Sequence, residues 1–195
     1  MNKTICVYSS SSCAIDKVYF DAARKLGREI AIRNDIFLYG GGLTGLMGAV
    51  AEAVHNNNGK VIGVIPEALN VKGIVYESCD ELIITKDMRT RKAKMDSLSE
   101  AFIALPGGYG TLEELLEIIT LKQLHYHCKP IVILNINNFY DKLIEFFEQI
   151  ITLKFAKREC STLYFTTNDI KEALDYIDSY TPSMPSSKWL TDVDV

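Results

Sequence analysis

Residues 106–114 form the segment of this sequence in which residue types and spacing point most directly to chemistry. The apolar run Ala101–Leu105 ends at a proline, and glycines occupy three of the next four positions. Glycines let a backbone turn tightly and approach a ligand closely. The helical pattern that follows opens with Thr111, and the first turn of a helix offers free N–H groups and the positive end of a dipole. This combination predicts an anion site, most naturally for phosphate.

Two carboxylates, Glu113 and Glu114, follow this phosphate loop, which indicates chemistry on a phosphorylated molecule. Glu114 also has a structural interpretation. In the spacing Thr111-x-x-Glu114 it completes a capping box, in which the glutamate accepts a hydrogen bond from the threonine backbone. The buried stripe expected on this helix consists of Leu112, Leu115, Leu116 and Ile119, and Glu114 projects off it. Because simple caps rarely follow a glycine-rich cradle, the pattern favours a functional role for Glu114.

A dense basic cluster lies at residues 86–95 of this acidic chain. If the segment is helical, one stripe combines apolar side chains with a single cation: Met88, Arg91, Met95 and Leu98. Arg89 and Lys94 point elsewhere and form a solvated face. A guanidinium among apolar neighbours is costly unless an anion pairs with it. Arg91 therefore pairs with a structural carboxylate, or else with a substrate phosphate or an active-site carboxylate, and the sequence leaves both open.

A second glycine-rich segment, residues 40–48, matches the dinucleotide fingerprint Gly-x-Gly-x-x-Gly after a strand-like run. Glu67 lies near the distance expected of an acid that binds a ribose. It follows Pro66, however, and so lies past the end of its strand. The alternative is that Gly45 and Gly48 let the following helix pack closely. Since a lone fingerprint is weak evidence, packing is favoured over NAD binding.

These segments need elements to position them, and the chain alternates short apolar runs with helical patterns. The predicted strands are Thr4–Tyr8, Ile36–Tyr39, Lys60–Ile65, Glu81–Thr85, Ala101–Leu105 and Ile131–Asn135, with a late one at Leu163–Thr166. The predicted helices lie near Asp16–Arg33, Leu43–Asn56, Asp87–Ser97, Leu112–His125, Tyr140–Leu153 and Asp169–Tyr180. Runs that are apolar on both faces are typical of a covered parallel sheet. The pattern therefore predicts an α/β fold that is doubly wound, with a mainly parallel sheet flanked by helices.

Ligands of such folds bind at the carboxyl ends of the strands. Three loops should gather there: residues 9–12, which are four serines, residues 40–48 and residues 106–111. A row of serines offers hydroxyl donors and acceptors, although it suits a polar turn equally well.

Composition places the chain among globular proteins of ordinary domain size. A net charge of −4 gives no global attraction to nucleic acid or acidic membranes, and no apolar run of 18 residues occurs. The five cysteines are scattered without a Cys-x-x-Cys pair, which favours reduced thiols in the cytoplasm. We expect a single catalytic domain over residues 1–180 and a C-terminal tail over residues 181–195.

His125 and His127 raise the question of a metal site. Histidines two apart on a helix diverge, and the sequence contains no second cluster of ligands. Cations near the negative end of a helix are the simpler interpretation. We therefore expect no metal, and the sequence suggests neither a Ser-His-Asp arrangement nor an activated cysteine.

Four motifs together resemble those of a known family. They are Gly40-Gly41-Gly42-x-x-Gly45-Leu46-Met47-Gly48, Gly63-Val64-Ile65-Pro66, Met88-x-x-Arg91-Lys92-x-x-Met95 and Pro106-Gly107-Gly108-Tyr109-Gly110-Thr111-x-x-Glu114. This combination resembles the LONELY GUY (LOG) family of cytokinin riboside 5′-monophosphate phosphoribohydrolases, long mislabelled as lysine decarboxylases. The similarity runs from about Ile5 to Tyr180.

The resemblance implies a Rossmann-like fold, a homodimer and hydrolysis of the N-glycosidic bond of adenosine-type monophosphates to free base and ribose 5-phosphate. It also implies that Arg91 and Glu114 are the catalytic pair. The residues that would bind the nucleoside 5′-monophosphate are Lys92, Gly107, Gly108, Tyr109, Gly110, Thr111, Leu112, Glu113 and Thr120, with Ser10, Gly41 and Gly42 from the neighbouring loops. Gly73 stands where plant members often carry a glutamate that contacts the substrate, so the resemblance does not imply which adenine base is preferred. No metal and no organic cofactor is needed.

A non-enzymatic alternative is a nucleotide or molybdenum-cofactor carrier of the same fold, which the phosphate loop would also suit. A carrier needs only the phosphate loops, so the presence of both Arg91 and Glu114 favours the enzyme. A lysine decarboxylase should carry a lysine that forms a Schiff base with pyridoxal phosphate, and a partner for the pyridinium nitrogen. No segment of the sequence is suited to those roles. Neither nucleic acid nor a membrane is expected as a partner.

Overall fold

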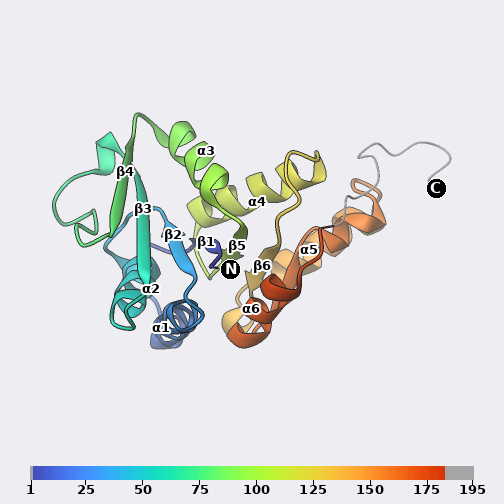
Figure 1. Ribbon diagram of the computed structural model, residues 1–195. Coiled ribbons are helices and arrows are strands. Elements are labelled where there is room, and N and C mark those ends of the chain that lie inside the picture. The colour runs from blue at the N-terminus through green and yellow to red at the C-terminus, as the bar shows by residue number, and fades with distance from the viewer. Residues whose placement is uncertain (1, 183–195) are drawn as a thin grey trace.

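A seven-stranded sheet forms the centre of the computed structural model, which describes residues 2–182 (Figure 1). The strands are β1 (Thr4–Tyr8), β2 (Ile36–Tyr39), β3 (Lys60–Pro66), β4 (Glu81–Thr85), β5 (Ala101–Ala104), β6 (Ile131–Leu134) and β7 (Phe165–Thr167). Their order is β4-β3-β2-β1-β5-β6-β7, and neighbouring strands are parallel throughout. The predicted α/β fold with a parallel sheet is confirmed.

Helices cover both faces of this sheet. They are α1 (Lys17–Ile32), α2 (Gly45–His55), α3 (Met88–Leu98), α4 (Tyr109–Gln123), α5 (Asp141–Thr152) and α6 (Ile170–Ser179). One face packs against α1, α2 and α6, and the other against α3, α4 and α5 (Figure 1). Each predicted helix is present, and the chain is doubly wound as predicted.

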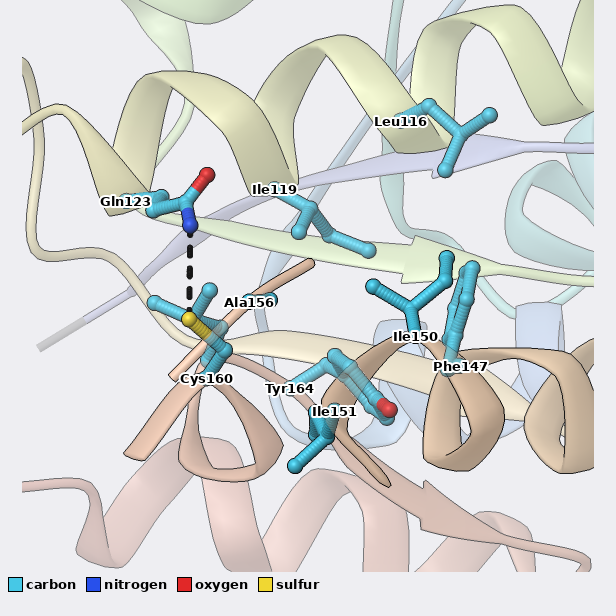
Figure 2. Close-up of a pocket in the computed structure, with 10 residues that line it drawn as sticks. Leu116, Ile119, Gln123, Phe147, Ile150, Ile151, Ala156, Cys160 and Tyr164 are labelled. Carbon is cyan, nitrogen blue, oxygen red and sulfur yellow. Dashed lines mark hydrogen bonds between the residues drawn. The ribbon is translucent and has the colours of Figure 1, made fainter. Parts of the chain in front are cut away.

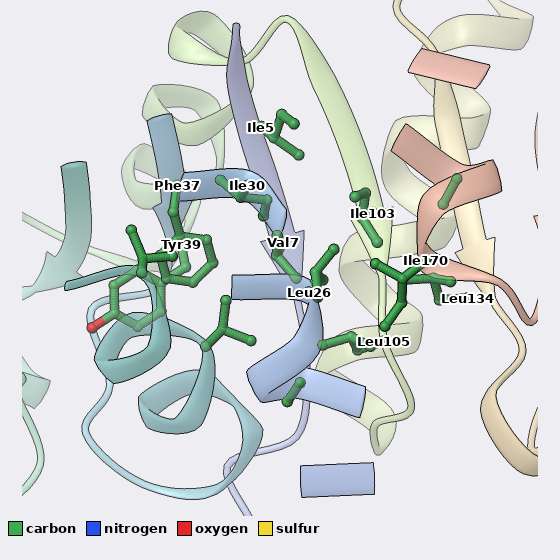
Figure 3. Close-up of a cluster of buried hydrophobic side chains, with 14 of the residues drawn as sticks. Ile5, Val7, Leu26, Ile30, Phe37, Tyr39, Ile103, Leu105, Leu134 and Ile170 are labelled. Carbon is green, nitrogen blue, oxygen red and sulfur yellow. The ribbon is translucent and has the colours of Figure 1, made fainter. Parts of the chain in front are cut away.

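The core has two halves because successive residues of a strand point to opposite faces. Ile5 and Val7 of β1 meet Leu26 and Ile30 of α1 on one side (Figure 3). Cys6 and the other alternate residues of β1 meet α3, α4 and α5 on the other side. Full burial of one such aliphatic side chain stabilises the fold by about 1.5–3 kcal/mol. Covering on both sides explains why the strands are continuous apolar runs.

The order of strands reverses its direction between β1 and β5. Strand β1 pairs with β2 on one side and with β5 on the other, with Tyr8 opposite Ala104 at the carboxyl end of the second pair. The connections on the two sides of this point lead outward in opposite directions, which opens a crevice at the carboxyl edge where ligands of such folds bind.

Several boundaries differ from those predicted. Strand β7 is Phe165–Thr167 in place of Leu163–Thr166, since Arg158–Thr162 forms a 3-10 helix just before it. The predicted tail lies outside the described residues from residue 183 onward. Within the described part of the chain, no helix is long and apolar enough to cross a membrane.

Candidate active site

The three loops predicted to gather meet at the carboxyl edge of the sheet. The backbone N–H of Ser10 donates to the carbonyl of Pro106 (3.3 Å), which joins the loop after β1 to the loop after β5. The Ser10 carbonyl accepts hydrogen bonds from the N–H groups of Leu46 (2.9 Å) and Met47 (3.4 Å), at the start of α2. The predicted gathering of these loops is confirmed.

The phosphate loop leads into α4 earlier than predicted. The helix begins at Tyr109, and Gly108 is its N-cap residue. The N–H of Leu112 donates to the carbonyl of Gly108 (3.0 Å). The N–H groups ahead of Leu112 belong to the first turn, where a helix offers no internal acceptor. Since Gly108, Tyr109 and Gly110 are exposed, an anion can reach these groups from solvent.

Gly107 joins this loop to the helix that follows it. A Cβ atom at Gly107 would lie 2.1 Å from Oγ1 and 2.5 Å from Cβ of Thr111. Thr111 is only 4% exposed and so has little freedom to move away. The close contact holds the loop against the first turn of α4. Only a glycine fits at position 107, because any Cβ atom would overlap the Thr111 side chain.

The buried stripe of α4 differs from the predicted one. The residues buried on this helix are Thr111, Leu115, Ile118 and Lys122, whereas Leu116 is 43% exposed. Glu114 lies one turn from both Thr111 and Ile118 and is therefore next to the buried stripe. Its side chain is 12% exposed, against 57% for Glu113.

The predicted capping box of Thr111 and Glu114 is wrong. Thr111 is the third residue inside α4, because Gly108 takes the N-cap position. The Glu114 carboxylate instead accepts a hydrogen bond from Nη1 of Arg91 through Oε1, at 2.8 Å. Glu114 is thus held by a side chain of another helix.

Arg91 reaches Glu114 from α3, whose N-cap Asp87 accepts a hydrogen bond from the N–H of Thr90 (2.8 Å). Its Nε donates to the carbonyl of Val64 on β3 (3.0 Å). The side chain is 9% exposed, and Met95 behind it is fully buried. The structure thus pairs Arg91 with a carboxylate of the protein itself, Glu114, which fits a structural and an active-site pairing alike.

The other residues of the predicted α3 stripe are less uniform. Met88 is 46% exposed and Leu98 is half-buried, so the buried part of the helix is short. Arg89 and Lys94 are exposed, as predicted for a solvated face.

Burial and charge act in opposite directions on Glu114. Burial raises the pKa of this carboxyl group, the charge and hydrogen bond of Arg91 lower it, and the net pKa lies above the ordinary value. Beneath the pair, burial raises the pKa of Cys6 to about 12 and that of Tyr8 well above its ordinary value, and the charge of Glu114 adds to both. Glu114 therefore binds a proton more tightly than an exposed glutamate does, which suits a base.

Lys92 connects the same two helices on their outer side. Its Nζ forms ion pairs with Glu113 and, at 3.0 Å, with Glu117, and its side chain is 15% exposed. Burial lowers the pKa of Lys92, but the two glutamates more than offset this effect and raise it overall. In this arrangement Lys92 holds α3 against α4, next to the contact between Arg91 and Glu114.

Gly41 and Gly42 lie beneath the segment that precedes β4. The N–H of Tyr76 donates to the carbonyl of Gly41 (2.9 Å), and Gly42 pairs with Val75 in an antiparallel bridge. Both glycines are buried, and Gly41 has a positive φ of 73°. Their contact with a nucleotide stays a prediction, since the partners seen here are protein.

Gly45 and Gly48 are explained by close packing. A Cβ atom at Gly45 would lie 2.5 Å from the Ser10 carbonyl oxygen, and one at Gly48 would lie 1.8 Å from the Leu43 carbonyl oxygen. The first-turn N–H groups that would hold a pyrophosphate donate to Ser10 instead. This geometry favours the packing interpretation of the fingerprint over NAD binding.

Two predicted nucleotide-binding residues are not part of the exposed loop. Leu112 is half-buried and packs against the core cluster on the α3, α4 and α5 side. Thr120 is exposed on the same face of α4 as Glu113, about 10 Å further along the helix. The structure does not bring Thr120 to the phosphate loop.

His127, which follows α4, has structural partners. Nε2 of His127 lies 2.9 Å from the carbonyl oxygen of Ile118. Nδ1 of the same ring accepts a hydrogen bond from the N–H of Lys129 (3.2 Å). Among residues 2–182, no group of three or more His, Cys, Asp or Glu side chains is placed to hold a metal ion.

Sequence reasoning missed two backbone positions that receive the Arg91 side chain: the carbonyl of Val64 and the Cα of Gly40. Both lie in motifs that the sequence displays, but a motif does not reveal that its backbone faces a guanidinium. One sequence feature points to these positions: an arginine on the buried stripe of α3 needs backbone acceptors for its N–H groups and space for its guanidinium.

Comparison with known proteins places this geometry in a family. A family model described as "Possible lysine decarboxylase" matches residues 47–177. A cytokinin riboside 5′-monophosphate phosphoribohydrolase of Arabidopsis thaliana is 43% identical over 178 residues, which cover 91% of this chain and 83% of that relative. A probable enzyme of the same name from Oryza sativa subsp. japonica is 43% identical over 180 residues, 92% of this chain and 74% of the relative.

Solved structures with the same fold include molybdenum-cofactor proteins. The molybdenum cofactor binding protein of Rippkaea orientalis superposes with a TM-score of 0.70 at 21% identity, covering 92% of this chain and 97% of that one. The Moco carrier protein of Chlamydomonas rheinhardtii gives 0.67 at 21% identity, with 91% and 96% covered. At this identity the likeness concerns the fold alone. The family model and the identity to the plant enzymes over most of the chain decide the assignment: the protein belongs to the LONELY GUY (LOG) family.

Proposed function

We propose that this protein hydrolyses the N-glycosidic bond of cytokinin riboside or other adenosine-type 5′-monophosphates, giving free base and ribose 5-phosphate. The observation that carries the proposal is the Arg91–Glu114 pair, whose side chains are 9% and 12% exposed and which lies one helical turn beyond the phosphate loop. The relatives named for this activity are 43% identical to the chain.

The phosphate loop supplies binding energy at a distance from the reacting bond. The N–H groups of Gly108–Thr111 would hold the 5′-phosphate at the positive end of α4. Binding of that remote group positions the ribose. The entropic part of the activation free energy is therefore offset by the binding of the phosphate. A nucleoside without the phosphate would lose this contribution.

Glu114 acts on the sugar. Breaking the bond between C1′ and the base nitrogen leaves positive charge on the ribose, as in glycosidases. The Glu114 carboxylate stabilises that charge and accepts a proton from water, whose oxygen forms the new bond to C1′. The electrons of the broken bond leave with the base, which is released after protonation. The raised pKa of Glu114 suits this role as proton acceptor.

Arg91 keeps the carboxylate ionised and oriented. Its guanidinium donates to Glu114 and to the Val64 carbonyl at the same time, which fixes the plane of the fork. Because arginine stays protonated in proteins, Arg91 is not the donor of a proton to the leaving base.

Chromatography of reaction products tests the proposal. Incubation with AMP and with isopentenyladenosine monophosphate should release adenine or the substituted adenine together with ribose 5-phosphate, while adenosine should remain intact. Equal turnover of adenosine and AMP, or release of inorganic phosphate in place of the base, would contradict it. A carrier protein, the second candidate, would return the nucleotide unchanged.

We further propose a homodimer. Helix α5 contains no buried residue, and two large apolar side chains are exposed here: Phe146 on the helix (55%) and Leu153 directly after it (58%). Beside it, Leu116 and Ile119 of α4 face Phe147 and Ile150 of α5 across an apolar groove (Figure 2). Uncovered apolar surfaces of this kind typically mark protein–protein contacts.

Sedimentation equilibrium should give a mass twice that of one chain at micromolar concentration, because a second copy would cover this surface. The variant Phe146→Asp should sediment as a single chain. A wild-type protein that remains monomeric would overturn the dimer.

We also propose that residues 1–180 form one catalytic domain located in the cytoplasm. A single sheet to which every described strand belongs supports the first point. The five free cysteines, which suit a reducing compartment, support the second.

A further inference from the structure

Gly40, the first glycine of the segment that resembles a dinucleotide fingerprint, lies against the guanidinium of Arg91. A Cβ atom at Gly40 would lie 1.9 Å from Nη2, 3.1 Å from Cζ and 3.5 Å from Nε of Arg91. The residue does not have a positive φ, unlike Gly41 and Gly45. Space for another side chain, and not an unusual backbone conformation, is therefore what requires a glycine at this position.

The Arg91 side chain cannot give way without losing its partners. Its Nε is bonded to the Val64 carbonyl at 3.0 Å and its Nη1 to Glu114 at 2.8 Å. Most of the side chain is enclosed, with 9% exposed. A methyl group at residue 40 would have to displace the guanidinium of Arg91. The end of this side chain moves more easily than the backbone of residue 40, directly after strand β2, and of Val64 on strand β3.

We propose that Gly40 is a positioning residue, which leaves the space in which Arg91 is held against Glu114. The first glycine of the fingerprint then serves a protein side chain and not a pyrophosphate. The part of this inference that concerns turnover rests on the proposed hydrolase function, whereas the part that concerns the Arg91–Glu114 contact does not.

The groups around Glu114 determine what displacement of Arg91 would do. Arg91 and Lys92 of α3 lower its pKa, Glu113 of α4 raises it, and Cys6 and Tyr8 of β1 lie below it in their protonated forms. If Arg91 moves away, burial acts on the carboxylate with less opposition. Glu114 should then hold its proton up to a higher pH.

A double-mutant cycle with Arg91 tests this role. Gly40→Ala should lower kcat by at least about 30-fold with a smaller effect on KM, since an interaction that acts in the transition state is lost. In the Arg91→Lys variant, which has no Nη2 atom, adding Gly40→Ala should lower kcat by less than about a further threefold. Full additivity of the two losses would overturn the proposal.

Carbon-13 NMR titration of Glu114 gives a readout that requires no substrate. Its pKa should be higher in Gly40→Ala than in the wild type, whether or not either protein hydrolyses a nucleotide. An unchanged pKa would contradict the inference, and an inactive wild type with a shifted pKa in the variant would contradict the hydrolase function alone.

Gly59→Ala serves as the matched control for crowding. A Cβ atom there would lie 2.7 Å from Ala31 Cβ and 2.7 Å from Val54 Cγ1, in the core away from the site. This variant should lower the melting temperature while kcat per folded molecule and the pKa of Glu114 stay unchanged. If Gly59→Ala altered them as Gly40→Ala does, general loss of packing would explain both.

Discussion

Glu114→Gln should lower the turnover number by at least about 100-fold while the fold stays intact. Glutamine has the same shape, and its amide oxygen can still accept the hydrogen bond that Arg91 donates to the carboxylate. It carries no negative charge for an oxocarbenium-like state and cannot take a proton from water. Steady-state kinetics with isopentenyladenosine monophosphate measures the loss.

Binding and stability separate this role from a structural one. The affinity for AMP should change by less than about threefold, because the N–H groups of the phosphate loop are untouched. The loss of stability should stay below about 2 kcal/mol, since Arg91 keeps an acceptor although it loses a counter-charge. Glu52→Gln, exposed on α2 on the opposite face of the sheet, is the control expected to keep wild-type turnover. A Glu114→Gln protein with full activity per folded molecule would make Glu114 a structural residue.

The sheet could be predicted from sequence because both of its faces are covered. A run such as Ile131–Leu134 is buried at every position, with alternate residues in the two halves of the core. Continuous apolar runs of this length, separated by helical patterns, leave few alternatives to a parallel sheet. The gathering of the loops at one edge then follows, because the carboxyl ends of parallel strands lie at the same edge of the sheet. The order of the strands was not predicted, since doubly wound folds occur with more than one order.

The orientation of α4 could not be predicted in the same way. The spacing of the leucines predicts a buried stripe that includes Leu116, yet Leu116 lies on an exposed groove, whereas Lys122 is only 2% exposed. The apolar pattern of a helix does not tell the core of one chain from a surface that another chain could cover. For this reason the predicted buried stripe is rotated around the helix axis relative to the observed one, and the prediction places Glu114 outside it.

The start of α4 was misplaced for a related reason. Gly110 has a poor intrinsic propensity for helices, at a cost of about 1 kcal/mol relative to alanine, so the sequence favoured a later start at Leu112. Packing of Thr111 against Gly107 overrides that propensity. The capping-box prediction failed as a consequence, because it assumed that Thr111 precedes the helix.

Arg91 and Glu114 were identified by resemblance and by the cost of burying a guanidinium, but their contact joins residues 23 positions apart. Local pattern contains no information about which helices lie side by side. The contact depends on Gly40 and Val64 as well, neither of which has a side chain that could be read as chemistry. Tertiary structure was needed to bring these four positions together.

Arg91→Met should lower turnover by at least about 100-fold and move the acidic limb of the kcat/KM profile to higher pH. Hydrolysis requires the ionised form of Glu114, so activity falls as the pH drops through the pKa of this group. Burial already places that pKa above its ordinary value of 4.5, and therefore the wild-type limb should lie above pH 4.5. Removal of the positive charge leaves burial unopposed, which raises the pKa further.

Arg91→Lys separates the charge from the geometry. Lysine keeps a positive charge near Glu114 but cannot donate to Glu114 and the Val64 carbonyl as a planar fork does. It should lose most of the turnover while its acidic limb moves less than that of Arg91→Met. Arg89→Met, on the exposed face of the same helix, should change neither quantity.

Profiles of kcat/KM recorded from about pH 4 to 9 test the assignment, since they report the groups of the free enzyme. If the limb stays at the same pH when Arg91 becomes methionine, a group other than Glu114 governs it, and the proposed catalytic pair is wrong.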